Sequence, residues 1–244
     1  MKTAAILIIG NEILSGRTRD ANVQTLARAL AAQGIRLDEV RVVADRHTAV
    51  VSAVNALRAS HDFVFTTGGI GPTHDDITTE CMAAAFGRVV VEDPEARAAL
   101  TEYYGAAQLN EARLKMACVV SGASLIANPL SAAPGFQVGN VFVLPGVPKI
   151  LEAMLPEVIS RLPVGTAIAS RTVTAWLRES EIASELTAIQ VAHSGVDIGS
   201  YPFMRDERFG TALVVRGVDA SARDAAVSHI VTMLAGRGAT YDAD

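Results

Sequence analysis

The stretch Thr66–Glu80, TTGGIGPTHDDITTE, joins the end of a short apolar segment to the start of a helix. Three glycines and a proline form a turn, and the adjacent aspartates Asp75 and Asp76 precede a helix expected to begin at Ile77. Two interpretations are open. The stretch is either a tight turn with a charged helix cap, or a loop whose backbone holds phosphate and whose carboxylates hold a metal ion.

Strands and helices alternate around this loop. Continuous apolar runs predict buried parallel strands, and apolar residues at helical spacing predict the crossover helices between them. The expected elements are strand Thr3–Ile9, helix Ala21–Gln33, strand Leu37–Val43, helix Thr48–Ser60, strand Phe63–Thr66 and helix Ile77–Phe86. This order predicts an α/β fold of three layers, a mostly parallel sheet with helices on both faces.

Ligands of such sheets bind beyond the carboxyl ends of the strands. Three predicted loops follow those ends, and each contains a carboxylate. They are Gly10–Arg19 with Glu12, Ala44–His47 with Asp45, and Thr67–Asp76 with the Asp75–Asp76 pair. We expect these loops to converge on one crevice.

The pattern continues as far as a stretch with one proline and one glycine, Leu162–Thr166, which we interpret as a domain boundary. The expected elements before it are strand Arg88–Glu92, helices Pro94–Tyr104 and Asn110–Ala117, a hairpin of Gly135–Val138 and Val141–Leu144 around the turn Gly139–Asn140, and helix Lys149–Arg161. The predicted domains are therefore residues 1–164 and residues 165–244.

Beyond the boundary the order changes to strand, helix, strand, strand, helix. The expected elements are Ala167–Ala175, Glu179–Ala192, Asp197–Pro202, Gly210–Arg216 and Ser221–Gly236. This order predicts a small α+β subdomain, an open sheet packed against two helices, with Trp176 and Tyr201 in its core. The arrangement resembles a KH-like subdomain, but no Gly-x-x-Gly joins two helices, so no RNA role is expected.

Composition limits the classes of partner. The net charge of −5 and the pI of about 5.6 argue against nucleic acid, which binds to basic surfaces. Cys81 and Cys118 are far apart in the sequence, and we expect them to be reduced thiols in the core. The apolar run Ala4–Ile9 is too short for a signal peptide, and no segment is long enough to span a membrane. We expect a soluble, cytoplasmic protein.

The glycines predict a phosphate site. Glycine lets the backbone approach a ligand closely, and amides before a helix N-terminus bind anions, which makes Gly68, Gly69 and Gly71 candidates. Asp75 and Asp76 would repel phosphate unless a divalent cation bridged them to it. As an alternative, Asp76 caps the following helix. Lys115, on a predicted helix, either reaches phosphate or lies in solvent.

Five motifs occur in a fixed order: IIGNEILSGRTRDAN, VVADR, TTGGIGPTHDDITTE, NPLSAAPG and LPGVP. Together they resemble the molybdopterin-binding (MoaB/Mog) domain family, and within it the N-terminal region of the CinA proteins. The phrases NEARLKMA and NVFVLPGVP also resemble the corresponding domain of eukaryotic FAD synthase. The resemblance does not include the deamidase domain of CinA proteins, so no deamidase activity is expected. NPLSAAPG lacks the Gly-Thr usual in CinA proteins, and LPGVP replaces the usual LPGPP.

The resemblance implies roles for individual residues. It implies catalytic roles for Asp45 and Asp76, and metal binding by Asp75 and Asp76. The implied phosphate- and substrate-binding residues are Thr67, Gly68, Gly69, Gly71, Pro72, Glu12, Ser15, Gly16, Asn22, Pro134, Gly135, Pro145, Gly146 and Pro148.

The leading functional prediction is a metal-dependent nucleotide pyrophosphatase of the ADP-ribose or FAD type, with Mg²⁺, Mn²⁺ or Co²⁺ as cofactor. The first alternative is molybdopterin binding or adenylyl transfer in molybdenum cofactor biosynthesis, with molybdopterin as ligand. The second is a ligand-binding module without turnover. The expected partner is a small nucleotide or pterin phosphate, without nucleic acid or membrane, and the resemblance implies a homo-oligomer.

Overall fold

The computed structural model describes residues 1–243 and divides into two compact units, Met1–Gly165 and a second that begins at Thr166. Each unit has its own apolar core. Within residues 1–243, every helix is either too short or too polar to span a lipid bilayer. The units are considered separately below.

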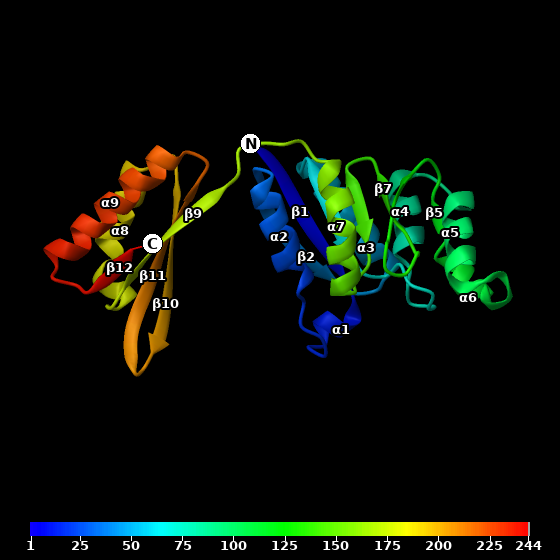
Figure 1. The fold of residues 1–244 in the computed structure, drawn as a ribbon, viewed down its shortest axis with the longest axis horizontal. Coiled ribbons are helices and arrows are strands. Elements are labelled where there is room, and N and C mark those ends of the chain that lie inside the picture. The colour runs from blue at the N-terminus through cyan, green and yellow to red at the C-terminus, as the bar shows by residue number, and fades with distance from the viewer. Residues whose placement is uncertain (244) are drawn as a thin grey trace. The chain divides into compact units, whose positions relative to one another are not determined.

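A six-stranded sheet with the order β2-β1-β3-β8-β7-β6 forms the centre of the first unit (Figure 1). The first four strands run parallel, whereas β7 and β6 are antiparallel to their neighbours. The strands are β1 (Lys2–Ile9), β2 (Ile35–Val43), β3 (Phe63–Thr67), β6 (Ser124–Ile126), β7 (Gly135–Val138) and β8 (Val141–Leu144). The mostly parallel sheet predicted from the sequence is confirmed.

Helices cover both faces of this sheet, as predicted. Leu26 of α2 and Met154 of α7 belong to the core on one face, and Val54 of α3 and Met82 of α4 to the core on the other. The helices of the unit are α1 (Asn11–Leu14), α2 (Asn22–Ala32), α3 (His47–Ser60), α4 (Thr78–Phe86), α5 (Pro94–Tyr104), η1 (Ala106–Gln108), α6 (Glu111–Lys115) and α7 (Pro148–Ser160).

Some short elements were not expected from the sequence. The helix α1 and the strands β5 (Cys118–Val120) and β6 lack a clear pattern because each has only three or four residues. The predicted strand Arg88–Glu92 is shorter, β4 (Val90–Glu92), and pairs with β5 in a separate two-stranded sheet. The predicted hairpin of β7 and β8 is confirmed with its bounds unchanged.

The second unit is a four-stranded antiparallel sheet, order β10-β11-β9-β12, with two α-helices. Its elements are β9 (Ala169–Ala175), η2 (Glu179–Glu181), α8 (Ala183–Ala192), β10 (Asp197–Arg205), β11 (Arg208–Gly217), α9 (Ala220–Gly236) and β12 (Tyr241–Ala243). The open sheet on two helices agrees with the prediction, and β12 is an additional strand.

Two expectations for the second unit are wrong. The helix predicted over Glu179–Ala192 breaks at Ile182, whose φ of −122° is not helical and whose side chain is fully buried in the core. Burial of this one side chain outweighs the helical pattern around it. Neither aromatic residue lies in the predicted core: Tyr201 is 46% exposed on β10, and Trp176 is half-buried outside the core cluster.

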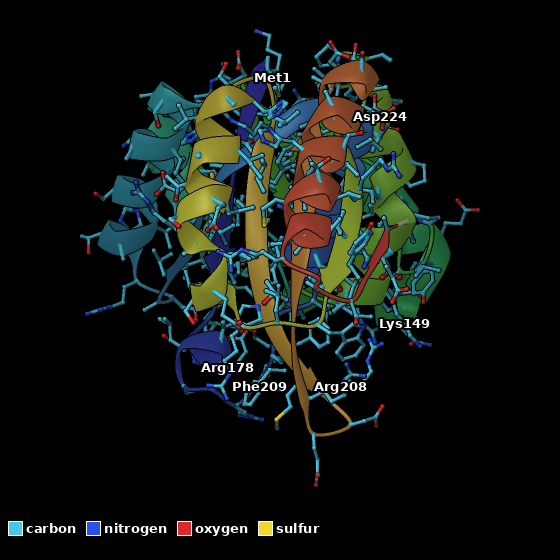
Figure 2. The ribbon with its side chains drawn as sticks, turned by 90° about the vertical axis from the view of Figure 1, so that its left-hand side faces the viewer. Met1, Lys149, Arg178, Arg208, Phe209 and Asp224 are labelled. Carbon is cyan, nitrogen blue, oxygen red and sulfur yellow. The ribbon has the colours of Figure 1, made fainter. Side chains whose placement is uncertain are left out.

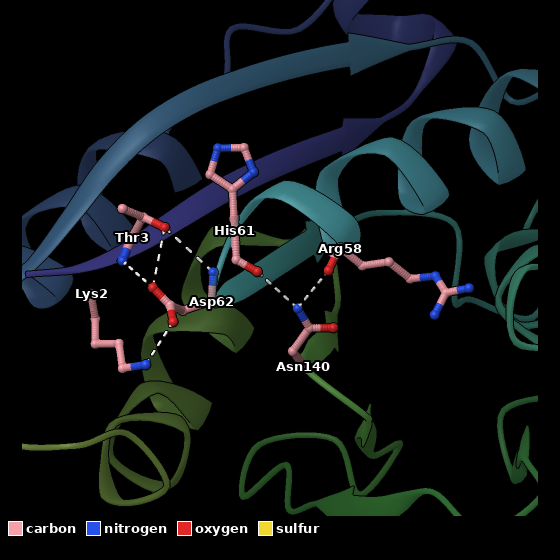
Figure 3. A network of polar contacts seen from close by, with 6 residues as sticks. All are labelled: Lys2, Thr3, Arg58, His61, Asp62 and Asn140. Atoms are coloured by element: carbon pink, nitrogen blue, oxygen red, sulfur yellow. Dashed lines mark hydrogen bonds and ion pairs between the residues drawn. The ribbon is translucent and has the colours of Figure 1, made fainter.

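A network of hydrogen bonds ties β1 to the ends of α3 and the β7–β8 turn (Figure 3). The Asp62 carboxylate accepts from Lys2 Nζ at 2.7 Å and from the backbone N–H of Thr3 at 2.9 Å. Asn140 Nδ2 donates to the carbonyls of Arg58 and His61, both at 3.0 Å. The network fixes the ends of the strands opposite the glycine loop.

We expect Asn140→Ala to lower the free energy of unfolding by about 1–3 kcal/mol, because two partly buried carbonyls lose their donor. Asn140→Asp keeps the size of the side chain but places an oxygen against both carbonyls. Its free energy of unfolding should therefore fall by at least as much as that of Asn140→Ala. Urea denaturation followed by circular dichroism measures both. Unchanged stability in both variants would contradict the structural role of the amide.

The ammonium of Lys2 and the amide of Thr3 lower the pKa of Asp62 below its usual value. Stabilisation by the ionised carboxylate is therefore present above the unfolded-state pKa of about 3.9 and is lost as the pH falls through the lower folded-state pKa. We expect Asp62→Asn to lower the melting temperature at neutral pH and the difference from wild type to vanish in strong acid. The control is Asp206→Asn, on an exposed turn. If the difference in melting temperature between wild type and Asp62→Asn persists unchanged into strong acid, the ionised carboxylate is not the source of the stabilisation.

Candidate functional site

Four parallel strands end at one edge of the first sheet, and the loops that follow them form the candidate site. These strands, β2, β1, β3 and β8, are consecutive neighbours. Their loops supply Asp45, Glu12, the stretch from Gly68 to Asp76, and the stretch from Pro145 to Pro148. Parallel strands place their carboxyl ends at the same edge, which is where ligands of such sheets bind. The three loops expected to converge do so, and a fourth joins them.

The loop after β1 is held against the loop after β2. The backbone N–H of Asn11 donates to Asp45 Oδ2 at 2.7 Å, and the N–H of Gly10 donates to the Val43 carbonyl at 3.2 Å. The Glu12 carboxylate lies against Gly10, where an added Cβ atom would be 2.4 Å from its Oε1. Asp45 and Glu12 are thus brought to the same end of the sheet.

Ser15 and Gly16 belong to the exposed turn after α1. The Ser15 hydroxyl donates to the carbonyl of Glu12 at 3.2 Å, and Gly16 has a φ of +71°. Both residues therefore have a local structural function in the turn, and among the described residues neither contacts the glycines of the β3 loop.

Gly68 occupies the most crowded position of the crevice. An added Cβ atom would lie 2.2 Å from the Ile9 carbonyl oxygen, and its φ is +100°. Its N–H donates to the Leu144 carbonyl at 3.1 Å, and a Cβ atom on Gly146 would lie 3.3 Å from its Cα. The backbones of β1, β3 and β8 thus approach too closely here for any side chain. Close packing explains this glycine, and its amide is not free for phosphate.

The amides that remain free lie further along the loop. Among the described residues, no hydrogen-bond acceptor faces the backbone N–H of Gly69, Ile70 or Gly71. Thr78, in the first turn of α4, orients this segment, since its hydroxyl donates to the Gly68 carbonyl and its N–H to the Gly69 carbonyl, both at 2.9 Å. Three consecutive free amides before a helix provide donors for an anion. Thr78 was not expected to have this role from the sequence, although a threonine at the helix start after a glycine loop suggests it.

The carboxylate of Asp76 folds back onto its own loop and does not cap the helix. Its Oδ2 accepts from the N–H of Thr73 at 2.8 Å and also from the Thr73 hydroxyl. The helix α4 begins at Thr78 after Ile77, without a side-chain cap. The alternative that Asp76 is the cap is therefore wrong, because the N-cap position is Ile77 and the Asp76 carboxylate bonds to Thr73 instead of the helix amides.

Asp75 and His74 are exposed beside it. The Thr73 hydroxyl, assisted by the charges of His74 and Lys115, holds the pKa of Asp75 below its usual value. The carboxylate therefore keeps its negative charge at neutral pH and is accessible to a ligand cation.

Lys115 fixes the backbone of the part of the β3 loop that carries Asp75 and Asp76. Its Nζ donates to the carbonyls of Thr73 and Asp76, both at 2.7 Å. This lysine stands at the end of α6, which Asn110 caps by accepting from the Arg113 N–H at 3.0 Å. The sequence predicted that Lys115 either contacts phosphate or lies in solvent, and neither prediction describes this pair of hydrogen bonds, which we call the Lys115 clamp. No sequence signal indicates that a lysine 39 residues away holds the loop.

Other predicted residues line the edge near β8. Asn22, 3% exposed, donates through Nδ2 to the Gly146 carbonyl at 2.9 Å, and its Oδ1 has no partner in the described chain. Pro145 is half-buried, and Pro148 opens α7. In the β3 loop, Thr67 is the buried last residue of β3, and Pro72 is exposed.

Pro134 and Gly135 lie one strand away, at the start of β7. An added Cβ atom on Gly135 would be 2.5 Å from the Val143 carbonyl oxygen, so packing against β8 also explains this glycine. Pro134 borders a separate cavity of about 510 Å³ between α5, the β6–β7 loop and α7. The other lining residues are Glu95, Ala96, Ala99, Glu102, Tyr103, Leu125, Ala127, Asn128, Ala132 and Glu157. This cavity shares only Pro134 with the predicted site.

We expect Gly68→Ala to lower the free energy of unfolding by about 3 kcal/mol or more, because the methyl group strikes a backbone oxygen that cannot move away. The matched control is Gly16→Ala, which has a similar positive φ but no atom within 4 Å of the added methyl, and should cost only about 1–2 kcal/mol. Urea denaturation followed by circular dichroism compares the two. Equal losses would show that the close approach of the strands does not limit stability.

Comparison with known proteins agrees with this geometry. Residues 5–164 match the family model described as "Probable molybdopterin binding domain", and residues 167–243 match the "FAD synthase, middle domain". A CinA-like protein of Syntrophus aciditrophicus is 37% identical over 81% of this chain and 50% of its own length. A "Probable FAD synthase" of Caenorhabditis elegans is 33% identical over 99% of this chain and 51% of its own length.

The chain thus spans about half the length of these two relatives. The crystal structure of CinA from Thermoplasma acidophilum, a protein described as having unknown function, is 37% identical, with a TM-score of 0.62 over 65% of this chain and 96% of that one. These matches confirm the resemblance drawn from the motifs. The chain therefore belongs to the molybdopterin-binding (MoaB/Mog-like) domain family, and within it resembles CinA-like proteins and FAD synthases.

Proposed function

We propose that this protein is a metal-dependent pyrophosphatase that hydrolyses a nucleotide diphosphate such as ADP-ribose or FAD. The observation that carries the proposal is the β3 loop, in which the free amides of Gly69, Ile70 and Gly71 precede the carboxylates of Asp75 and Asp76. A single loop thereby offers donors for phosphate oxygens and ligands for a cation. The FAD synthase relatives support a nucleotide as substrate.

The donor set fits an ion of the magnesium type. Among residues 1–243, no group of three or more histidines, cysteines and carboxylates could enclose a metal. Mg²⁺ commonly takes one or two protein carboxylates and completes its coordination with substrate phosphates and water. Asp75 is exposed and ionised, and Asp76 Oδ1 has no partner in the described part of the chain. We assign the metal to these two residues together with the substrate pyrophosphate.

The protein residues bind and orient the substrate in this proposal. The three free amides donate to pyrophosphate oxygens, and Lys115 holds the loop in the conformation that presents them. When bound, the metal supplies charge neutralisation and an acidified water. The water oxygen bonds to one phosphorus and the bridging P–O bond breaks, so that ADP-ribose gives AMP and ribose 5-phosphate, and FAD gives AMP and FMN.

Asp45 has a second role in the proposal. Its Oδ2 accepts from the Asn11 N–H, whereas Oδ1 has no partner among the described residues. We assign Asp45 to orienting the attacking water or the metal from the neighbouring β2 loop, since the carboxyl ends of β2, β1 and β3 lie at one edge.

One observation favours a second candidate function. The match of residues 5–164 is to a molybdopterin-binding domain, so a pterin phosphate is the competing ligand, either bound or adenylylated. The third candidate is a binding module without turnover. All three place an anion on the same amides and differ in what happens to it.

The experiment is AMP release from ADP-ribose and from FAD with Mg²⁺, Mn²⁺ or Co²⁺. We expect wild type to turn over at least one substrate and Asp76→Asn to lose at least about 100-fold in kcat/KM, the scale expected when a metal ligand or catalytic electrostatic contact is removed.

The matched control is Asp206→Asn, which makes the same chemical change on an exposed turn of the second unit and should retain full activity. Circular dichroism verifies that each variant is folded. Full activity in folded Asp76→Asn would refute the metal role. No turnover with any metal would refute the hydrolase proposal, and titration with molybdopterin would then test the second candidate.

A further inference from the structure

The sheet of the second unit has one face without helices. Val173, Leu213 and Val215 point to the other face, where they form a core with residues of α8 and α9. Side chains alternate along a strand, so their neighbours point away from the helices. The uncovered set comprises Trp176, Tyr201, Phe203, Arg205, Arg208 and Arg216, and we call it the aromatic–arginine face.

Two glycines allow the rings of this face to lie on the sheet. Gly210 stands directly opposite Phe203 in the β10–β11 register, and a Cβ atom on it would be 2.4 Å from the Phe203 ring. A Cβ atom on Gly199 would be 2.7 Å from the Tyr201 ring. Glycine weakens a strand interior and is used there when something must approach the backbone closely. Here the approaching groups are two aromatic rings.

Each ring of the face carries a guanidinium group. Arg208 lies 4.9 Å from the ring centre of Trp176, Arg205 lies 5.6 Å from that of Phe203, and Arg216 lies 5.9 Å from that of Tyr201. Trp176 and Phe203 also contact each other edge to face, with centroids 5.5 Å apart. Two of the pairs therefore contact each other, and the Tyr201–Arg216 pair lies further along the same face of β10 and β11.

A fourth pair extends this face around the end of the hairpin. Arg178 lies 4.4 Å from the ring centre of Phe209, and Figure 2 shows both residues, with Arg208, at the end of the sheet where β10 turns into β11. Phe209 is 51% exposed. Aromatic rings and arginines are therefore available on both sides of the hairpin end.

The guanidinium groups of the face lack anionic partners. Within residues 1–243, no ion pair involves Arg205, Arg208 or Arg216. By contrast, Arg171 and Arg237 of the same unit pair with Asp224 and Glu185. Arg216 stands opposite Asp197 in the register without forming an ion pair with it, so the three guanidinium groups remain able to bind an anion.

We infer that the aromatic–arginine face binds a single strand of nucleic acid. Open antiparallel sheets that carry exposed aromatic residues stack successive bases, and arginine both stacks on bases and contacts phosphates. Tyr201 and Phe203 are two residues apart on one strand, or about 7 Å. This is about twice the 3.4 Å rise per nucleotide of a duplex strand, so an extended, unstacked strand matches the spacing. A second copy of this chain is a less suitable partner, because its arginines and those of the first copy would repel each other across the contact.

The face departs from the expectation set by net charge. The whole chain carries −5, but charge summed over a chain does not report on one surface. The register places Asp197 and Asp242 on the same face, and the hairpin turn adds Asp206 and Glu207. These four carboxylates balance the four arginines of the face, Arg178 included, so the face has no net positive charge. Stacking therefore supplies most of the affinity, and we expect binding in the micromolar range at low salt, typical of non-specific contacts.

The test uses the full chain and a fluorescein-labelled ten-nucleotide oligothymidylate. Anisotropy of the label reports binding, and quenching of Trp176, the single tryptophan of the sequence, independently reports stacking at this face. With three phosphate contacts, log K should fall with log salt at a slope of about −2. The double variant Arg205→Gln/Arg208→Gln should bind at least tenfold more weakly, and its slope should be smaller by about 1.4.

Matched variants separate the proposal from general effects. Arg237→Gln removes one arginine from the helix side of the same unit and should bind as wild type does. Tyr201→Ala should bind about tenfold more weakly, whereas Tyr201→Phe keeps the ring and should bind like wild type. Asp76→Asn should also bind normally, so failure of the pyrophosphatase proposal is distinguishable from failure of this one.

Three results would overturn the inference. The first is no anisotropy change up to about 100 μM protein at low salt, the weak limit of non-specific binding. The second is an equal loss in Arg237→Gln and in the double variant. The third is AMP that quenches Trp176 and displaces the oligonucleotide with the affinity of the oligonucleotide itself, which would assign the face to mononucleotides.

Discussion

The first unit depends on the close approach of three backbones at Gly68. A Cβ atom at this position would overlap the Ile9 carbonyl oxygen, and a Cβ atom on Gly146 would lie 3.3 Å from the Gly68 Cα. Strands β1, β3 and β8 therefore end together without side chains between them. The loops that carry the carboxylates and amides of the site start from this point, so their separation is set by backbone contact. Side-chain packing could not hold them as closely.

This constraint divides the glycines of the loop into two kinds. Gly68 is required by packing, and its amide is used by Leu144, whereas the amides of Gly69 and Gly71 remain free. A glycine-rich loop thus serves packing and ligand binding through different residues. The two opening interpretations of the stretch, turn and phosphate loop, are compatible because they concern different atoms. Only the helix-cap part of the first interpretation is wrong.

Sequence reasoning succeeded where the local pattern and the environment agree. Apolar runs such as Thr3–Ile9 mark strands buried on both faces, and Gly139–Asn140 marks a hairpin whose turn requires glycine at a φ of +56°. It failed where a contact between residues far apart in the sequence determines the local structure. Ile182 breaks a helical pattern to enter the core, and β12 exists because β9 offers an unpaired edge. At the site, the motifs found the loop, but the clamp by Lys115 lies 39 residues away and leaves no periodic signal.

The chemistry that separates the competing functions lies outside the anion-binding amides. Pyrophosphate and pterin phosphate present similar oxygens to Gly69, Ile70 and Gly71, so these donors cannot choose between them. Discrimination must come from groups that contact the rest of the ligand, because a site selects by the polar groups that a wrong ligand leaves unpaired. Asn22 Oδ1, buried without a partner beside Gly146, is such a group, since burial of an unpaired acceptor is costly. A ligand or water that donates a hydrogen bond to Asn22 Oδ1 gains more binding free energy than one that does not. The identity of the substrate is therefore expected to depend on the β8 side of the crevice, where LPGVP differs from the usual CinA motif.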